Sequence, residues 1–232
     1  MKLIFKFILA TLLVGALGLG IYTYKYHSLA IEGWKLFNDR CNSVNPTLIK
    51  VRNTHLALGA AVSGRATPSA EQFSGDLGVL LTSADKYIEL ERNWLDKQSA
   101  FMNRWDFKLL APDYVKTAGK YQLAMYEAYY KYYKVVSDMN KAGDKAKETG
   151  TEFQFEGSPT ELMSKFQEER WANQDLYFDA FDKGLEIKDW RKYFAQVPPP
   201  DCPEENMNIP EYYSPTPTSI PTTNDSDMEI KS

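Results

Sequence analysis

The sequence predicts an all-α protein, with an N-terminal transmembrane helix followed by an antiparallel four-helix bundle with long helices. Three observations lead to this prediction. The chain opens on an apolar segment, apolar residues then recur at helical spacing over long stretches, and proline-containing start signals separate those stretches. Sustained strand alternation is lacking, except in the short run TEFQFE at residues 151–156.

Composition limits the classes of partner. The chain has 232 residues, of which 44% are hydrophobic and 25% charged, which fits one domain of moderate size with additional segments. A net charge of −4 and a pI near 5.4 argue against a nucleic-acid-binding surface, which needs clustered Lys and Arg. We therefore expect no nucleic-acid partner.

Residues 1–26 form the predicted membrane anchor. The run from Phe7 to Tyr24 carries no charged side chain, and an apolar run of about 18 to 20 residues can span a bilayer as a helix. The apolar core of a cleaved signal peptide is shorter, about 7 to 15 residues. We expect an uncleaved signal anchor, while cleavage near Gly18 or Gly20 would instead give a secreted protein.

The orientation of this anchor rests on features outside it. Lys2 and Lys6 precede the apolar run, and Lys25, Lys35 and Arg40 follow it, so the positive charges on its two sides are nearly balanced. A cysteine pair and a polar tail favour export of the body. The prediction is a single-pass protein of the cell membrane, with a cytoplasmic N-terminus and an extracytoplasmic body.

Residues 27–197 form the predicted bundle. Asn45-Pro46 and Thr67-Pro68 each place a capping residue before a proline at a first helical position. Ser158-Pro159-Thr160-Glu161 is a capping box, and Pro112 marks another start. These signals predict helices at residues 28–63 (bent or broken at Pro46), 68–106, 112–142 and 159–195, which most simply form an up-down-up-down bundle.

Polar residues interrupt two of the apolar seams. The second predicted helix carries a coiled-coil-like seam of apolar residues spaced by three and four. Four polar residues occupy core-type positions on the second and fourth helices: Glu91, Gln98, Glu169 and Asn173. A buried carboxylate needs a partner, which Arg92 or Arg170 could supply. Such a buried polar layer either sets the helix register or lines a pocket inside the bundle.

The segment YQLAMYEAYYKYYKVV, residues 121–136, contains six tyrosines. On a helical wheel its apolar and aromatic side chains cover an arc of about 180°, whereas a simple surface helix shows a stripe of roughly 100°. The wide arc favours a bundle helix that contacts two neighbours. The alternative is an exposed aromatic face for a partner, for which Tyr126 and Tyr130 are the candidates.

The chain has two cysteines, Cys41 and Cys202, without a companion at metal-ligand spacing. The predicted topology brings both to the membrane-side end of the bundle, where a disulfide would close a loop of about 160 residues and stabilise the fold by about 4 to 5 kcal/mol. Two free thiols are the alternative. No metal and no cofactor is expected.

The loop at residues 142–158 and the C-terminal tail are the remaining features. Phe153 and Phe155 alternate with polar residues in the loop, and they either fold onto the bundle end or form a contact strip for a partner. Residues 198–232 are rich in Pro, Thr and Ser and are predicted to be a disordered tail.

Motifs of catalysis are missing: the sequence has no P-loop, GxSxG, HExxH or dinucleotide fingerprint, and only two histidines, His27 and His55. No motif assigns the chain to a family. We therefore expect a non-enzymatic, membrane-anchored scaffold or protein-interaction module of the cell envelope. The alternative is an extracytoplasmic bundle that binds a small molecule, a lipid or a cell-wall fragment.

Overall fold

The structure, a computed structural model, describes the backbone of residues 2–186 and the side chains of residues 8, 10–184 and 186. This part of the chain is helical and contains no strand, so the fold class is confirmed as a helical bundle, while residues 151–155 of the possible strand are irregular. The helices are α1 (Lys2–Ser43), α2 (Asn45–Val62), α3 (Ala70–Asn103), α4 (Trp105–Leu110), α5 (Asp113–Thr149) and α6 (Pro159–Glu186).

The predicted start signals lie within a few residues of the helix starts, but two predicted caps are wrong: Val44, not Asn45, is the N-cap of α2, and α3 begins after Thr67-Pro68. Pro46 occupies the first turn of α2. The N-cap of α3 is Ser69, whose hydroxyl accepts from the backbone N–H of Gln72 while the Gln72 side chain accepts from the Ser69 N–H. At α6 the Ser158 hydroxyl accepts from the N–H of Glu161 at 3.3 Å. These bonds satisfy N–H groups that a helix start otherwise leaves without partners.

Three boundaries differ from the predictions. The predicted anchor and the start of the first bundle helix form one continuous helix, α1, of 42 residues. The second predicted helix breaks at Arg104 into α3 and the short α4. α5 continues to Thr149, because the Lys- and Glu-rich residues after 142 still favour a helix, and it ends at Gly150 with φ of 65°.

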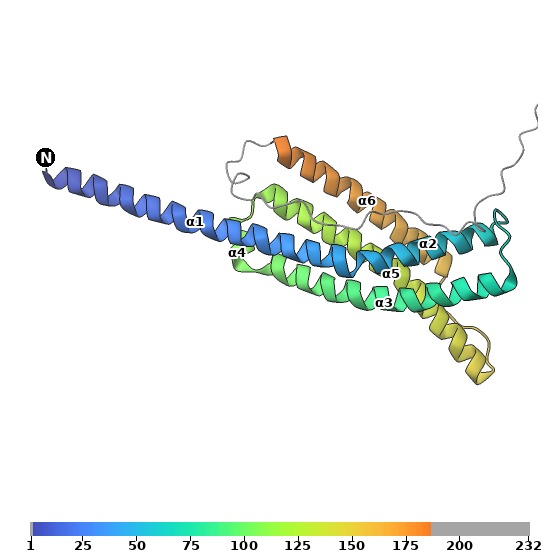
Figure 1. The fold of residues 1–232 in the computed structure, drawn as a ribbon. Helices are drawn as coiled ribbons and strands as arrows, with labels where there is room; N and C mark the ends of the chain where they lie inside the picture. Colours follow the sequence, from blue (N-terminus) through green and yellow to red (C-terminus); the bar gives the residue numbers. More distant parts are fainter. Residues whose placement is uncertain (1, 187–232) are drawn as a thin grey trace, which may run out of the picture.

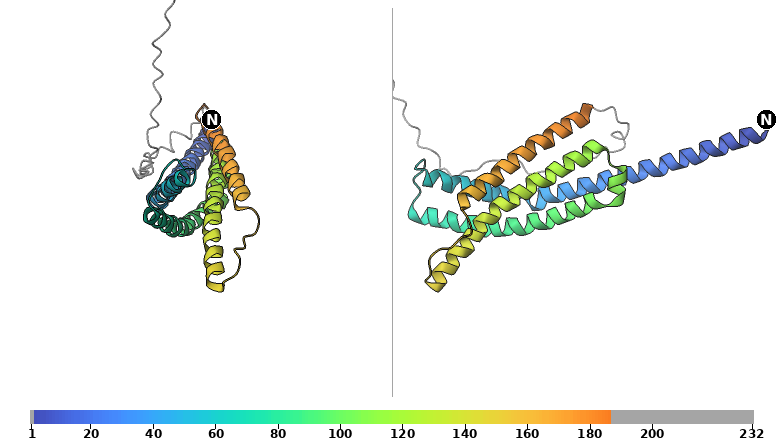
Figure 2. Two further views of the ribbon diagram at one scale, coloured as in Figure 1. Left: turned by 90° about the vertical axis from the view of Figure 1, so that its right-hand side faces the viewer. Right: turned by 180° about the vertical axis from the view of Figure 1, so that it is seen from behind.

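The helices form four legs. α1 and α2 together make one long leg, α3 runs back beside it, and α5 and α6 follow as an antiparallel pair (Figures 1 and 2). α3 lies between α2 and α5, and α5 makes its most extensive contact with α6. The short helix α4 crosses the end of the bundle between α3 and α5, close to the place where α1 leaves it (Figure 1).

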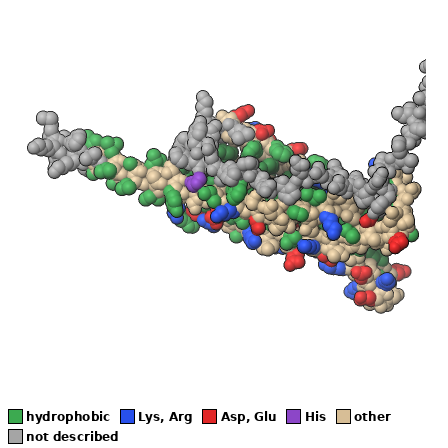
Figure 3. All heavy atoms as spheres, viewed as in Figure 1, with side chains coloured by type: hydrophobic (Ala, Val, Ile, Leu, Met, Phe, Trp, Pro, Cys, Tyr) green, Lys and Arg blue, Asp and Glu red, His purple; other side chains and the backbone are tan. Residues whose placement is uncertain are grey.

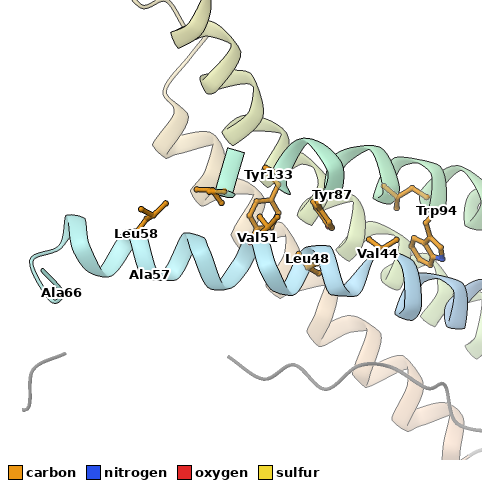
Figure 4. Close-up of a cluster of buried hydrophobic side chains, with 12 residues drawn as sticks. Val44, Leu48, Val51, Ala57, Leu58, Ala66, Tyr87, Trp94 and Tyr133 are labelled. Carbon is orange, nitrogen blue, oxygen red and sulfur yellow. The ribbon is translucent and has the colours of Figure 1, made fainter. Parts of the chain in front are cut away.

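Two apolar clusters hold these legs together. The larger one joins α2, α3 and α5 and includes Val51, Tyr87, Trp94 and Tyr133 (Figure 4). The smaller one joins α1 to α4, through residues such as Tyr26 and Leu29 of α1, Phe101 of α3, and Phe107 and Leu110 of α4. Burial of each such side chain contributes roughly 1.5 to 3 kcal/mol to the stability of the fold. This contribution holds α4 against the end of the bundle.

The N-terminal half of α1 projects away from the bundle (Figures 1 and 3). Its exposed large apolar side chains are Ile8, Leu12, Leu13, Val14, Leu17, Leu19 and Ile21. Among the described residues, no helix meets the length and apolarity that a membrane crossing demands. The side chains of residues 2–7 and 9, which open the predicted anchor, lie outside the described set, and the anchor stays a prediction.

Candidate functional site

A groove of about 440 Å³ lies between α2, α5 and α6. Helix α2 contributes Arg52 and His55, α5 contributes Tyr129, Tyr132 and Tyr133, and α6 contributes Arg170 and Trp171. The spacing of the three tyrosines places them on one side of α5, since residues three and four apart are neighbours on a helix surface. The same spacing brings Arg52 and His55 to the groove side of α2.

Aromatic rings form the walls of this groove. His55 stacks on Tyr132 with a centroid separation of 5.7 Å and meets Tyr133 edge-on at 6.2 Å. The Tyr132 hydroxyl is 3.5 Å from Nε2 of His55. Tyr132 and Tyr133 contact each other in a T-shaped arrangement at 5.1 Å. These contacts give the wall a rigid, mainly apolar surface with hydroxyl groups at its edge.

Arg170 lies across the α6 side of the groove. Its guanidinium carbon is 4.3 Å from the centroid of the Tyr129 ring and 4.0 Å from that of Trp171. One terminal nitrogen donates to the Gln174 amide oxygen at 3.3 Å, while Nε is buried and has no hydrogen-bond acceptor among the described residues. The guanidinium of Arg170 therefore lacks a charged partner among the described residues, and an anion in the groove could supply one.

The positive charge of the groove comes from its two arginines. Burial lowers the pKa of His55, which is therefore neutral near pH 7. Burial raises the pKa of Tyr133, and Tyr132 and Tyr129 add to this shift, whereas the charges of Arg52 and Arg170 act against it. Both guanidinium groups thus act on one hydroxyl. Chemically, the groove suits an anionic group carried on an aromatic or aliphatic body.

Tyr126 and Tyr130, the candidates from the sequence, lie outside this groove. Tyr126 stacks under the guanidinium of Arg40 at 3.5 Å and meets Trp94 edge-on at 5.2 Å. Tyr130 lies 5.9 Å from the guanidinium of Arg92. Both tyrosines are half-buried and pack against the larger apolar cluster.

Glu91 is buried and pairs with Arg40, not with Arg92 or Arg170 as the sequence suggested. Glu91 Oε1 accepts from Nε and Nη2 of Arg40 at 3.3 and 3.1 Å. Arg92 lies on the outer side of α3 and pairs with Asp96 at 3.3 Å. Burial raises the pKa of Glu91 to about 6, and the Arg40 charge acts against this shift.

The other members of the predicted polar layer are divided between core and surface. Gln98 is buried, whereas Glu169 and Asn173 are half-buried. Asn173 donates to the backbone oxygen of Glu169 at 2.7 Å, and Glu169 approaches Lys165 at 4.0 Å. Because Glu169 and Asn173 are only half-buried, the four side chains do not form one buried layer.

Phe153 and Phe155 lie in the loop between α5 and α6, at the end of the molecule opposite α4 (Figure 1). Phe153 is 52% exposed. Phe155 is half-buried and lines a second, shallower pocket of about 410 Å³ with Leu162 and Phe166. One aromatic ring therefore folds onto the bundle, and the other is available at the surface.

Cys41 is fully buried beside Arg40, in the middle of the leg that α1 and α2 form. The predicted topology placed it at the membrane-side end, which is wrong because α1 runs on to Ser43 before the leg bends. Cys202 lies outside the described residues, as does the tail at residues 198–232. The disulfide between the two cysteines stays a prediction.

Within residues that the structure describes, no cluster of three His, Cys, Asp or Glu side chains is placed to hold a metal ion. Comparison of the chain with protein-family models, with curated proteins and with solved structures found no match. The groove therefore has to be interpreted from its own chemistry. The sequence does not reveal the groove, because Arg52, His55 and Arg170 come together only in the folded bundle and each alone is an ordinary helix residue.

Proposed function

We propose that this chain is a non-enzymatic, membrane-anchored protein-interaction module of the cell envelope, and that the α2–α5–α6 groove receives a segment of a partner protein. The observation that carries this proposal is the composition of the groove: tyrosine and tryptophan rings on three helices, with two arginines between them. Tyr, Trp and Arg are the residues that most often dominate the binding energy of protein interfaces.

The exposed face of α6 extends this surface. Trp171, Phe178 and Phe181 are 47%, 51% and 44% exposed. Their spacing of seven and three residues places them on one side of the helix. Contiguous exposed apolar side chains of this kind are typical of interaction sites. A partner segment with an acidic group for Arg170 and apolar side chains for this strip fits the surface.

The anchor and the cellular location belong to the same proposal. They are supported by the continuity of α1 and by the exposed apolar side chains on its projecting half. The proposed location is the cell membrane, with the bundle on the extracytoplasmic side. A disulfide between Cys41 and Cys202 is part of the proposal, and it is compatible only with an oxidising compartment.

A second candidate function is the binding of a small anionic ligand. The groove volume of about 440 Å³ falls within the range of roughly 300 to 1,000 Å³ typical of small-molecule sites. In this alternative, the two arginines bind a carboxylate, sulfonate or phosphate, and the rings contact its apolar body.

The test is site-specific photo-crosslinking in the native host. A photoreactive amino acid replaces Leu56, which is exposed at the groove, and in a matched control it replaces the exposed Glu89 on α3. We expect a discrete protein adduct from position 56 only, and its loss when Arg52→Met and Arg170→Met are combined with it. Adducts of equal yield from both positions, or none from position 56, would contradict the proposal.

The same arginine double variant distinguishes the second candidate. The purified protein is titrated with 8-anilinonaphthalene-1-sulfonate, an aromatic anion whose fluorescence rises on binding. A small-ligand site predicts saturable binding that the double variant weakens by roughly ten-fold or more, since each charged hydrogen bond contributes about 1.5 to 3 kcal/mol. Unchanged binding in the double variant would exclude the groove as the site.

A further inference from the structure

We propose that α4 lies flat on the surface of the lipid bilayer and that Trp105 and Leu109 insert into its interfacial region. This inference rests on the membrane anchor of the proposed function. It adds a second membrane contact that would hold the end of the bundle against the lipid.

Exposure of apolar side chains on α4 is the first observation. Trp105 is 75% exposed and Leu109 is 69% exposed. The two residues are four apart and share one side of the helix, whereas Phe107 and Leu110 on the opposite side are buried in the cluster that joins α4 to α1. A six-residue helix thus has one face in the core and an equally apolar face in the solvent.

Position is the second observation. α4 crosses the end of the bundle from which the projecting half of α1 emerges, and it lies transverse to α1 (Figures 1 and 2). It packs against α1 through Tyr26 and Leu29, immediately after the exposed apolar stretch that ends near Ile21. If α1 crosses the bilayer, α4 is therefore at the level of the membrane–water interface.

Charge is the third observation, because an anionic lipid surface repels uncompensated carboxylates. Asp106 of α4 and Glu32 of the neighbouring α1 both pair with Arg104. Asp113, at the start of α5, pairs with Lys116 at 2.9 Å. Lys108 is exposed immediately before Leu109. The charges next to the exposed apolar side chains of α4 are thus matched or positive.

The chemistry of Trp105 fits this environment. Tryptophan is enriched at membrane–water interfaces, where its ring meets the acyl chains and its N–H stays hydrated. Tyr24 of α1, which is 71% exposed, offers a second aromatic ring near the same level. A short amphipathic helix beside a membrane anchor would fix the tilt of the bundle, and with it the direction in which the groove faces.

The experiment uses the full chain in vesicles of phosphatidylcholine and phosphatidylglycerol with brominated acyl chains, which quench tryptophan at the interface. Trp105→Phe removes one indole from the five tryptophans of the chain, and Trp171→Phe is the matched control on the exposed face of α6. We expect the quenched part of the emission to fall in Trp105→Phe, since the indole at the interface is removed, and to stay unchanged in Trp171→Phe. Circular dichroism checks that both variants are folded.

Two contrary results have different meanings. If the chain floats with the vesicles and Trp105→Phe leaves the quenching unchanged, the anchor stands and the inference about α4 is overturned. If the wild-type chain does not float with the vesicles at all, the anchor itself fails, and the inference about α4 fails with it. Flotation and quenching therefore test the proposed function and the further inference separately.

Discussion

The two sides of the bundle use the same chemical pair, an arginine over aromatic rings, in opposite ways. Where α1 meets α3, Arg40 stacks on Tyr126 and Trp94 and is 2% exposed, and the carboxylate of Glu91 neutralises it. Between α5 and α6, Arg170 stacks on Tyr129 and Trp171 at the wall of an open groove. Its hydrogen-bond partner is the neutral amide of Gln174.

This difference separates structure from binding. A fully buried guanidinium needs a charged partner, because burial of an isolated charge costs several kcal/mol. An arginine at a groove keeps part of its hydration and can exchange it for an incoming anion. Arg40 with its buried partners should therefore contribute to the stability of the bundle, whereas Arg170 should determine what the groove binds. Four predictions test this contrast, from the largest expected effect to the smallest.

Removal of the Glu91 carboxylate should have the largest effect. Glu91→Ala leaves Arg40 buried without its counter-charge, and the free energy of unfolding should fall by about 3 to 5 kcal/mol in urea titrations followed by circular dichroism. Replacement of both partners, as in Arg40→Met with Glu91→Leu, should recover most of this loss. Arg170→Met is the matched control on the open side and should cost less than about 1 kcal/mol. A small effect of Glu91→Ala would contradict a structural role of the buried Arg40–Glu91 pair.

The second prediction concerns the attachment of α6. A Cβ atom at Gly184 would overlap the ring of Tyr114 on α5, whereas one at Gly119 would lie 3.1 Å from the flexible end of Met102. Gly184→Ala should therefore displace α6 and lower the free energy of unfolding by roughly 1 to 3 kcal/mol. Gly119→Ala should be neutral or slightly stabilising, since alanine favours a helix over glycine. Equal results for the two variants would contradict close packing of α6 at this position.

Local signals in the sequence were sufficient for the helices. Pro46 and Ser158 act within one helical turn, so these helix starts can be predicted to within a residue or two without knowledge of the fold, although at α3 the cap is Ser69 and not the predicted Thr67. The burial of Glu91 and Gln98 also follows from spacing on a single helix. The end of α5 was harder to predict, because apolar periodicity stops near residue 142 while the helix continues without it to Gly150.

Contacts between helices were beyond prediction from the sequence. Arg92 was a plausible partner for Glu91 because it is the next residue, but adjacent residues on a helix point about 100° apart. The true partner, Arg40, lies 51 residues earlier and approaches only because α1 packs along α3. The groove likewise depends on contacts between helices. Its residues come from three helices, and the pattern of any single helix does not indicate that they meet.

The third prediction uses the pH dependence of the buried pair. Burial raises the pKa of Glu91 from its ordinary value near 4.5 to about 6. The folded state then binds the proton more tightly than the unfolded state, so the stabilisation is present below pH 4.5 and is lost as the pH rises through about 6. Between about pH 5 and about pH 7.5, wild type should lose about 1 kcal/mol more than Glu91→Gln. His55 titrates equally in both proteins and cancels, and parallel pH profiles would exclude the raised pKa.

The smallest effect on stability should come from a substitution at the groove, at Trp171. Comparison with the buried Trp94 tests the contrast directly. Trp171 is 47% exposed and Trp94 is 3% exposed, although each lies against an arginine. Trp94→Ala should cost about 3 to 5 kcal/mol, because it leaves a cavity in the core and removes the hydrogen bond from Nε1 to the Leu36 carbonyl oxygen at 2.9 Å. Trp171→Ala should cost only about 0.5 kcal/mol, yet it should reduce the crosslinking yield from position 56. If Trp171→Ala destabilised the fold as much as Trp94→Ala, the ring would be a structural element of α6, and the groove would lose its strongest candidate for a partner contact.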